Sequence, residues 1–234
     1  MTTEAAQKTV AAKTVAALRD LPARDSDIYA DENEEACDPL AAPEVRACLA
    51  RRCDIWIFGY GSLMWNPGFR HCAAEPALLH GWHRSFCVYS RRYRGTPERP
   101  GLVLGLDRGG SCKGMAFRIA VADLEEALGQ LWQREMVGGV YDMRELTLRL
   151  AGGGTVSAHA FTVRRSHPGY AGRLSLDETA RLILQGIGGR GHCREYLENT
   201  VRHLERLGLV DGPLHRLEAK VKELAAKEPP CVPA

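Results

Sequence analysis

The chain has 234 residues, of which 45% are hydrophobic and 26% charged, an inventory typical of a globular protein. Its 31 Lys and Arg against 29 Asp and Glu give a net charge of +2, which argues against nucleic acid or an anionic membrane as the default partner. Because no apolar run reaches the roughly 18–20 residues of a membrane helix and no secretory signal begins the chain, we expect a soluble, cytoplasmic protein, and a monomer.

The first 50 residues differ in composition from the rest of the chain. Seven of the fourteen residues at 25–38 are acidic, and such a run is typical of a solvated tail. We therefore expect residues 1–50 to be a flexible N-terminal extension with a short helix at 44–49. No internal repeat or Gly/Ser linker divides the remainder of the chain, so residues 51–234 are predicted to form one domain.

Strand patterns come first in this domain. Residues 55–58 form a continuous apolar run, which predicts a strand buried on both faces. Further strands are predicted, each bounded by Gly, Pro or Asp, at residues 82–90, 102–107, 112–119, 145–150 and 156–163. The three glycines at 152–154 indicate a hairpin turn between the last two strands.

Helical patterns gather toward the end of the chain. Asp123 and Glu126 predict a capping box before an apolar face that continues until Gly138, and Ser175 and Glu178 predict a second one. Two more helices are expected at 194–207 and 214–226. Because the strands precede most of the helices, the pattern favours an α+β fold, a sheet or barrel with helices packed on it.

A loop with two glycines, Gly59-Tyr60-Gly61-Ser62-Leu63-Met64, comes directly after the first predicted strand. Its glycines allow a sharp turn and a close approach of backbone N–H groups to a ligand, because no Cβ stands in the way. Such a loop suits a carboxylate or a developing oxyanion, but a turn that only redirects the chain has the same signature. This loop matches neither of the two glycine-rich phosphate-binding patterns.

Glu135 stands at the C-terminal end of the helix that begins near Asp123. A carboxylate there faces the negative end of the helix dipole, which is unfavourable by about 0.3–1 kcal/mol on an exposed surface. The dipole and any burial would raise the pKa of this carboxyl group toward the range useful for a general acid and base. The alternative is an exposed glutamate paired with Arg134 or Arg144.

A basic and aromatic loop occupies residues 89–97, YSRRYRGTP. Arg91 and Arg92 could hold an anionic substrate through their guanidinium groups, or the loop could simply be solvated. Its arginines lack wider basic surroundings, which argues against a nucleic-acid surface.

The other residues with catalytic potential form no recognisable centre. The eight cysteines include no C-x-x-C pair, and the eight histidines form no ligand cluster, so we expect reduced thiols and no metal. Cys87 and Cys112 lie within strand-like runs and are predicted to be small core residues. Because G-x-S-x-G is absent, Ser62 is interpreted as a hydrogen-bonding loop residue and not as a nucleophile.

The ordered set of these motifs resembles the ChaC family of γ-glutamylcyclotransferases, in its glutathione-specific branch. The set consists of FGYGSLMWNPGF at 58–69, Gly81-Trp82, Ser90-Arg91-Arg92, Pro100-Gly101, and Arg134-Glu135-Met136 before Gly139 and Tyr141. The resemblance covers residues 54–224. It implies an α+β, γ-glutamylcyclotransferase-like fold, namely a small mixed β-barrel or sheet with packed helices. It also implies an enzyme that cleaves glutathione to 5-oxoproline and cysteinylglycine.

The resemblance also implies roles for single residues. Glu135 matches the family's acid/base, and the loop from Gly59 to Met64 matches its substrate-binding loop. Tyr196 matches a tyrosine often found near that site. From its charge, and not from the resemblance, Arg91 or Arg92 is expected to anchor a substrate carboxylate. The chain departs from the family pattern at two positions, because Asn and Phe are usual where it has Cys193 and Glu198.

The chemistry that the resemblance implies fits the absence of a nucleophilic triad. In a γ-glutamyl amide the α-amine can attack the γ-carbonyl of the same molecule and close a five-membered lactam, so the enzyme supplies no covalent nucleophile. It has to supply an acid/base and donors for the oxyanion, and neither a metal nor a cofactor. Two alternatives stay open, namely a cyclotransferase for other γ-glutamyl amines or peptides and a non-catalytic carboxylate-binding module.

Overall fold

The computed structural model describes residues 38–227 of the chain. These residues fall into two compact units, and each unit is discontinuous in the sequence. The first contains the described residues up to Arg84 together with Leu106–Arg164, and the second contains Ser85–Gly105 and the described residues from Arg165 onward. Residues 1–37 of the predicted N-terminal extension lie outside the described part.

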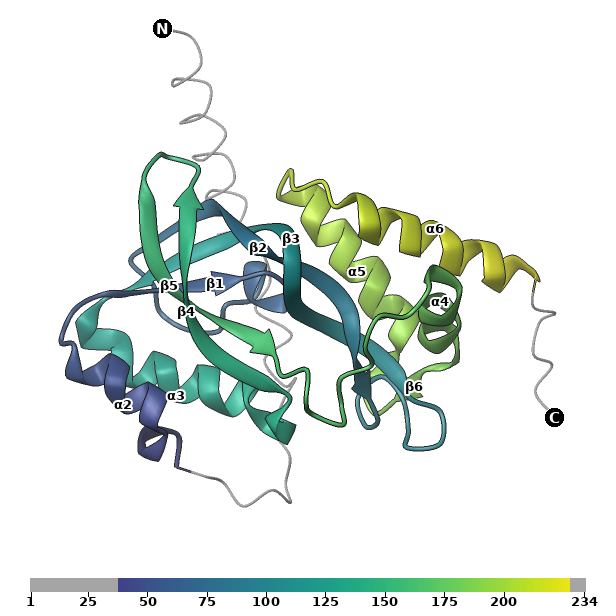
Figure 1. Ribbon diagram of the computed structural model, residues 1–234, viewed down its shortest axis with the longest axis horizontal. Helices are drawn as coiled ribbons and strands as arrows, with labels where there is room; N and C mark the ends of the chain where they lie inside the picture. The colour runs from purple at the N-terminus through teal and green to yellow at the C-terminus, as the bar shows by residue number, and fades with distance from the viewer. Residues whose placement is uncertain (1–37, 228–234) are drawn as a thin grey trace, which may run out of the picture. The chain divides into compact units, whose positions relative to one another are not determined.

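The first unit is built on a closed barrel of five strands in the order β1-β3-β2-β4-β5 (Figure 1). The strands are β1 (Ile55–Gly59), β2 (Ala73–Ser90), β3 (Gly101–Ile119), β4 (Tyr141–Leu150) and β5 (Thr155–Val163). Strand β1 pairs antiparallel with β3 and parallel with β5, which makes the barrel mixed. The expected α+β class with a small mixed barrel is therefore confirmed.

Two of the predicted strands are one. The sequence predicted separate strands at 102–107 and 112–119, but β3 runs without a break through both. Gly109 and Gly110 caused the error, because glycines usually mark a turn. Both have positive φ, 104° and 68°, so they let the strand bend and continue. The turn at 152–154 is confirmed, with the Leu150 N–H donating to Gly154 O at 3.1 Å.

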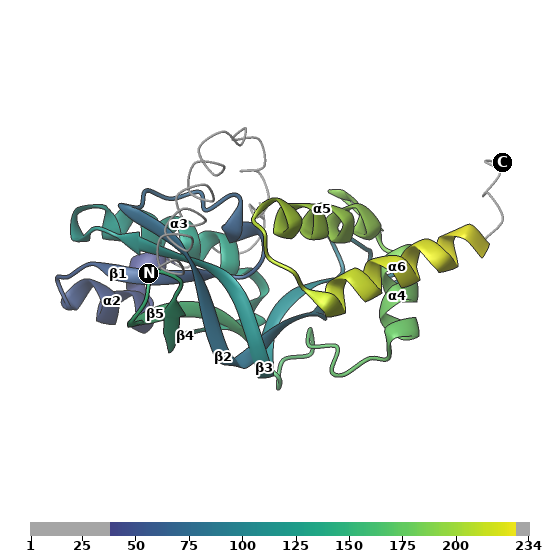
Figure 2. The same cartoon turned by 90° about the horizontal axis from the view of Figure 1, so that it is seen from above.

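Helices of the first unit flank the barrel strands in sequence. They are η1 (Pro39–Ala41), α2 (Pro43–Ala50), η2 (Ser62–Met64), η3 (Val121–Asp123), α3 (Leu124–Glu135) and η4 (Val137–Gly139). Helix α2 packs against α3, and the two lie side by side in Figure 2. The helix predicted at 44–49 is thus confirmed, with Val45 and Cys48 buried. The packed chain begins ahead of residue 51, and the domain boundary there stays a proposal.

The predicted capping box at the start of α3 is wrong. Asp123 is the last residue of the short 3-10 helix η3, with φ −101° and ψ 1°, and its side chain makes no capping hydrogen bond. An N-cap residue normally has an extended backbone, which lets its side chain turn back to the first N–H groups. The apolar face of α3 is as predicted, with Leu124, Leu128 and Leu131 each 1% exposed.

The second unit consists of helices together with the end of β2 and the start of β3. Its other elements are α4 (Leu176–Gln185), the short strands β6 (Ile187–Gly188) and β7 (Gly191–His192), α5 (Cys193–Arg206) and α6 (Gly212–Lys227). Helices α4, α5 and α6 pack against one another (Figure 2). The predicted capping box of α4 is confirmed, since Ser175 Oγ accepts from Glu178 N–H and the Glu178 carboxylate accepts from Ser175 N–H.

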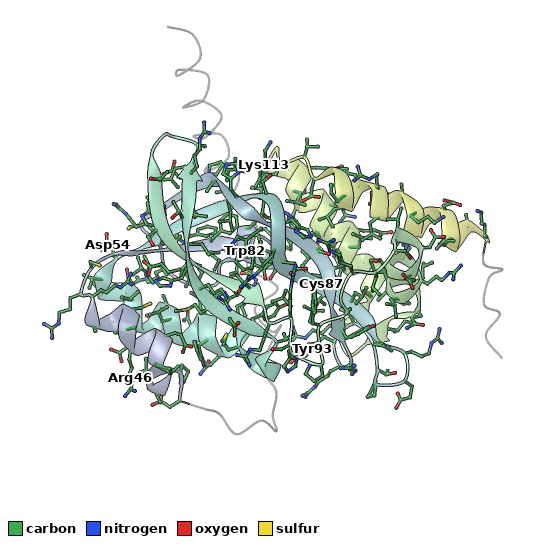
Figure 3. All side chains as sticks on the ribbon, viewed as in Figure 1. Arg46, Asp54, Trp82, Cys87, Tyr93 and Lys113 are labelled. Atoms are coloured by element: carbon green, nitrogen blue, oxygen red, sulfur yellow. The ribbon has the colours of Figure 1, made fainter. Side chains whose placement is uncertain are left out.

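The cysteines of the described part are all free thiols. Cys87 and Cys112, predicted as core residues, are 1% and 2% exposed, and Cys87 is labelled in Figure 3. Within residues 38–227, no helix has the length and apolar character that crossing a membrane requires.

Candidate active site

The loop after β1 starts in a crowded position. Strand β1 pairs with β3 as far as Gly59, which lies opposite Met115. A Cβ placed on Gly114 would lie 2.3 Å from the carbonyl oxygen of Gly59 and 2.7 Å from the Phe58 ring, closer than any real side chain can stand. Glycine at 114 therefore lets the end of β1 approach β3 closely, and this contact fixes where the loop begins.

Internal hydrogen bonds shape the loop itself. Met64 N–H donates to Gly61 O and Asn66 N–H to Ser62 O, both at 2.9 Å. In the part of the chain that the structure describes, the N–H groups of Gly61, Ser62 and Leu63 have no protein acceptor. Such N–H groups at the start of a helical turn are available to a ligand.

Arg134, the second-last residue of α3, joins the helix end to this loop. Its Nη1 donates to Asn66 O at 2.6 Å, and its Nη2 donates to Ser62 Oγ at 2.7 Å. The sequence offered Arg134 only as a possible surface partner of Glu135, and its contact with the loop was not predicted. Its contacts show that one guanidinium fixes a side chain of the loop and the backbone just after it, so the end of α3 and the loop are held together.

Glu135 is the last residue of α3 and lies beside Arg134. Its Oε1 is 3.3 Å from Arg134 Nε, and its side chain is only 12% exposed. Burial raises the pKa of Glu135, and the positive charge of Arg134 opposes this only in part. The alternative of an exposed pair with Arg144 is wrong, because Arg144 pairs with Asp142 at 3.0 Å. The pair with Arg134 exists, but it is largely buried.

Arg84 on β2 also reaches the loop, a contact that was not predicted from the sequence. It is 4% exposed, and its Nη1 donates to Tyr60 O at 2.8 Å. The sequence does hold a signal. In the run from Trp82 to Ser90, Arg84 falls in phase with Phe86 and Val88, which are core residues. A charged residue on the inward face of a strand breaks the period-2 pattern, and such breaks are typical of functional sites.

The remaining predicted site residues belong to the second unit. The guanidinium of Arg91 lies 5.3 Å from the centre of the Tyr89 ring, and that of Arg92 lies 5.9 Å from the Tyr93 ring. The Tyr196 ring makes an edge contact with Phe86 at 5.6 Å between ring centres. The structure thus connects the end of α3, which carries Glu135, to the loop through Arg134 within the first unit. The roles of Glu135 and the loop, and a substrate-binding role for Arg91, Arg92 and Tyr196, stay predictions.

The two positions that depart from the family pattern are both satisfied locally. Buried Cys193 donates its thiol hydrogen to Leu102 O at 2.9 Å and accepts from Leu102 N–H at 3.4 Å. Glu198 pairs with Arg194 one helical turn earlier, at 2.7 Å. One thiol therefore serves both backbone groups of Leu102.

The described side chains include no group of three or more His, Cys, Asp or Glu that could hold a metal ion.

Comparison with known proteins identifies the family to which this chain belongs. A family model described as ChaC-like protein matches residues 55–224. The glutathione-specific gamma-glutamylcyclotransferase of Escherichia coli (strain K12) is 39% identical over 192 residues, which cover 81% of this chain and 83% of that protein. The chain belongs to the ChaC family. The human glutathione-specific gamma-glutamylcyclotransferase 1 is 35% identical to this ChaC-family chain over 158 residues, covering 66% of this chain and 71% of that protein.

A solved structure shares the fold of this ChaC-family chain. It is a gamma-glutamyl cyclotransferase specific to glutathione from yeast, with a TM-score of 0.67 and 22% sequence identity. The match covers 73% of this chain and 96% of the yeast chain. The family that the motifs indicated is thereby confirmed, and so is its fold. The names of the relatives are those of enzymes.

Proposed function

We propose that this ChaC-family chain cleaves glutathione to 5-oxoproline and cysteinylglycine, with Glu135 as the acid/base. One observation carries the proposal. Glu135 is largely buried, and its neighbour Arg134 holds the loop after β1. A carboxyl group with a raised pKa therefore contacts the arginine that binds Ser62, in a loop with available N–H donors. The names of the E. coli and human relatives support glutathione as the substrate.

The reaction removes two protons from the α-nitrogen, because an ammonium group becomes a lactam N–H. The α-ammonium of the γ-glutamyl group, whose pKa is about 8, must lose a proton before its nitrogen can attack. Glu135 takes this proton, the nitrogen bonds to the γ-carbonyl carbon, and the lactam ring closes. In the tetrahedral intermediate the α-nitrogen loses its second proton to water. The C–N bond to the cysteinyl nitrogen then breaks while Glu135 gives its proton to that nitrogen, and the freed amine takes up a further proton from water at neutral pH. A carboxyl group with a raised pKa exchanges a proton with an amine at a smaller free-energy penalty than an ordinary glutamate does.

The tetrahedral intermediate carries a negative charge on the former carbonyl oxygen. We assign its stabilisation to the N–H groups of Gly61, Ser62 and Leu63. Within the described chain these N–H groups have no protein acceptor. Donors that are already oriented stabilise the developing charge without reorganising during the reaction. The remaining loop residues, Gly59, Tyr60 and Met64, form the frame that holds these donors.

The proposal is tested with purified protein and two substrates, glutathione and γ-glutamyl-alanine, followed by mass spectrometry of 5-oxoproline. The Glu135→Gln variant should keep the fold and lose turnover with glutathione. Glu125→Gln is the matched control, because Glu125 is an exposed acid on the same helix and should leave turnover unchanged. A Glu135→Gln protein that retains more than a few per cent of the activity would exclude Glu135 as the acid/base.

The two alternatives give different outcomes in the same assay. Formation of 5-oxoproline from γ-glutamyl-alanine as readily as from glutathione would indicate a cyclotransferase for other γ-glutamyl compounds. Binding of glutathione without any product, equal for the wild type and Glu135→Gln, would indicate a carboxylate-binding module.

A further inference from the structure

Arg84 is a buried cation that the proposed reaction does not itself use. It lies on β2, and its guanidinium touches backbone on two sides, with Nη1 donating to Tyr60 O at 2.8 Å and Nη2 donating to Lys113 O. The Nη1 group also contacts Met64 Sδ at 3.7 Å. Lys113 is labelled on the ribbon in Figure 3. Burying a guanidinium is unfavourable unless its donors are used, so the fold keeps this arginine for the groups that it contacts.

These contacts stand where two strands separate. The pairing of β1 with β3 ends at Gly59 and Met115, and the loop then leaves the sheet. The carbonyl groups of Tyr60 and Lys113 come just beyond that last pair, where the β1–β3 ladder has ended. Arg84 spans both with the fixed plane of one guanidinium, a geometry that a lysine ammonium cannot reproduce. Arg84 therefore sets the direction of the chain at Tyr60, the first residue after β1.

The orientation of Tyr60 O determines that of the next N–H. The described chain contains no cis peptide bond, so the peptide between Tyr60 and Gly61 is trans and planar. In a trans peptide the N–H points opposite to the C=O. Because Tyr60 O points at buried Arg84, the Gly61 N–H points away from it. That N–H is one of the groups with no protein acceptor in the described chain.

We propose that Arg84 is a positioning residue that orients the peptide between Tyr60 and Gly61, so that the Gly61 N–H is presented to the substrate oxyanion. The inference rests on the proposed function, since it assigns the oxyanion to this loop. Without Arg84, a peptide next to a glycine is free to rotate, because Gly61 has no Cβ to resist the change. Rotation would put a carbonyl oxygen where the intermediate needs a donor.

The test is the steady-state kinetics of Arg84→Met with glutathione. Methionine fills similar space but donates no hydrogen bond. A donor that acts in the transition state changes kcat and leaves KM nearly unchanged. We expect kcat to fall about 10²- to 10³-fold, as for loss of one oxyanion donor. Arg84→Lys, which keeps the charge and one donor, should restore part of kcat and serves if the methionine variant does not fold.

The control separates positioning from stability. Ile119→Val on β3 removes one buried methyl group, destabilises by about 0.5–1.5 kcal/mol and leaves the loop's hydrogen bonds intact. It should keep the wild-type kcat at temperatures where it is folded. A crystal structure of Arg84→Met should show the Tyr60 carbonyl turned from its wild-type direction. If folded Arg84→Met or Arg84→Lys retains the wild-type kcat, Arg84 is only a tether between strands and the inference is wrong.

Failure of the proposed function would look different. In that case wild-type protein would form no 5-oxoproline, and a crystal structure of Arg84→Met would remain the readout. An unchanged Tyr60–Gly61 peptide in that structure would overturn the inference regardless of activity.

Discussion

Glu135 combines a position and an environment that work against its charge. It ends a helix, where the dipole is negative, and it is largely buried, with Arg134 as a partial counterweight. The position could be predicted from the sequence, because the apolar period of the helix and the glycines after it located the end. The burial could not, since it depends on Arg134 reaching Ser62 and Asn66 across 72 and 68 residues of sequence.

The raised pKa of Glu135 predicts a pH-dependent difference in stability between wild type and Glu135→Gln. The folded protein binds this proton more tightly than the unfolded chain, where the pKa is about 4.3. Its contribution to the free energy of unfolding is therefore fully present below that pH and is lost as pH rises through the folded pKa. Glutamine has no proton to lose, so the variant should gain stability relative to the wild type as pH rises.

The measurement is urea unfolding of both proteins from pH 4 to pH 8. The slope of the difference matters and not its absolute value, because the buried amide of glutamine adds an offset that does not depend on pH. A difference that stays flat across the range would contradict the raised pKa.

Buried Cys193 should be inert in the folded protein. Burial raises the pKa of its thiol to about 11, and its hydrogen is committed to Leu102 O. Only the thiolate reacts with alkylating agents. Iodoacetamide at pH 7.5 should therefore label exposed Cys53 and Cys72 and leave Cys193 unmodified until urea is added, as peptide mass spectrometry would show. Labelling of Cys193 at the rate of Cys53 would mean that its helix opens readily.

At the scale of single elements, the two helix starts that the sequence treated alike differ in the structure. Ser175→Ala should lower the free energy of unfolding by about 1 kcal/mol, because it removes a capping hydrogen bond that is present. Asp123→Ala removes no cap and weakens only an exposed ion pair with Arg70 at 3.5 Å, so its effect should be about 0–1 kcal/mol at most. Denaturant unfolding of both variants checks the order. An Asp123→Ala loss as large as that of Ser175→Ala would restore the predicted box.

Gly114 on β3 and Gly129 on α3 allow a matched comparison of alanine substitutions at a crowded and an open position. A Cβ at Gly114 would meet Gly59 O at 2.3 Å, whereas one at Gly129 within α3 would meet nothing within 4 Å. Gly129→Ala should stabilise by about 0.5–1 kcal/mol, because alanine is the better helix residue. Gly114→Ala should destabilise the protein and lower kcat, since β1 must move away from β3 and take the loop with it. Thermal melts and the glutathione assay measure both effects.

These elements show where the sequence suffices. Local chemistry, such as the Ser175 box or the turn at 152–154, is set by neighbouring residues and was predicted correctly. The continuity of β3 through Gly109 and Gly110 was not predicted, because a bulge and a turn use the same residues and only the partner strand decides between them. Arg84 was missed for a similar reason, since its role exists only where β1 and β3 separate.

At the scale of the whole molecule, the ordered motifs indicated the family and the α+β barrel, and both are confirmed. The division into two units was not predicted. It cannot be found by composition or by a linker, because β2 and β3 each run through both units and no break in the sequence marks the boundary.

The interleaved units predict that neither can be obtained by a single cut. A fragment of residues 165–234 lacks Ser85–Gly105, which supply hydrogen bonds such as those between Leu102 and Cys193. It should therefore show no cooperative thermal transition by circular dichroism, whereas the full chain should show one. Cooperative unfolding of the fragment would mean that its helices suffice for a core.

The same interleaving orders events during synthesis on the ribosome. Leu102 leaves the exit tunnel 91 residues ahead of Cys193, the group to which it will bond. In that interval the chain completes β4 and β5, with which the five-stranded barrel can close. The first unit can thus fold while Ser85–Gly105 of the second unit still lack the residues from Arg165 onward, against which they pack. For that interval the strand ends at Ser85–Gly105 are exposed, and a nascent-chain chaperone would find its target there.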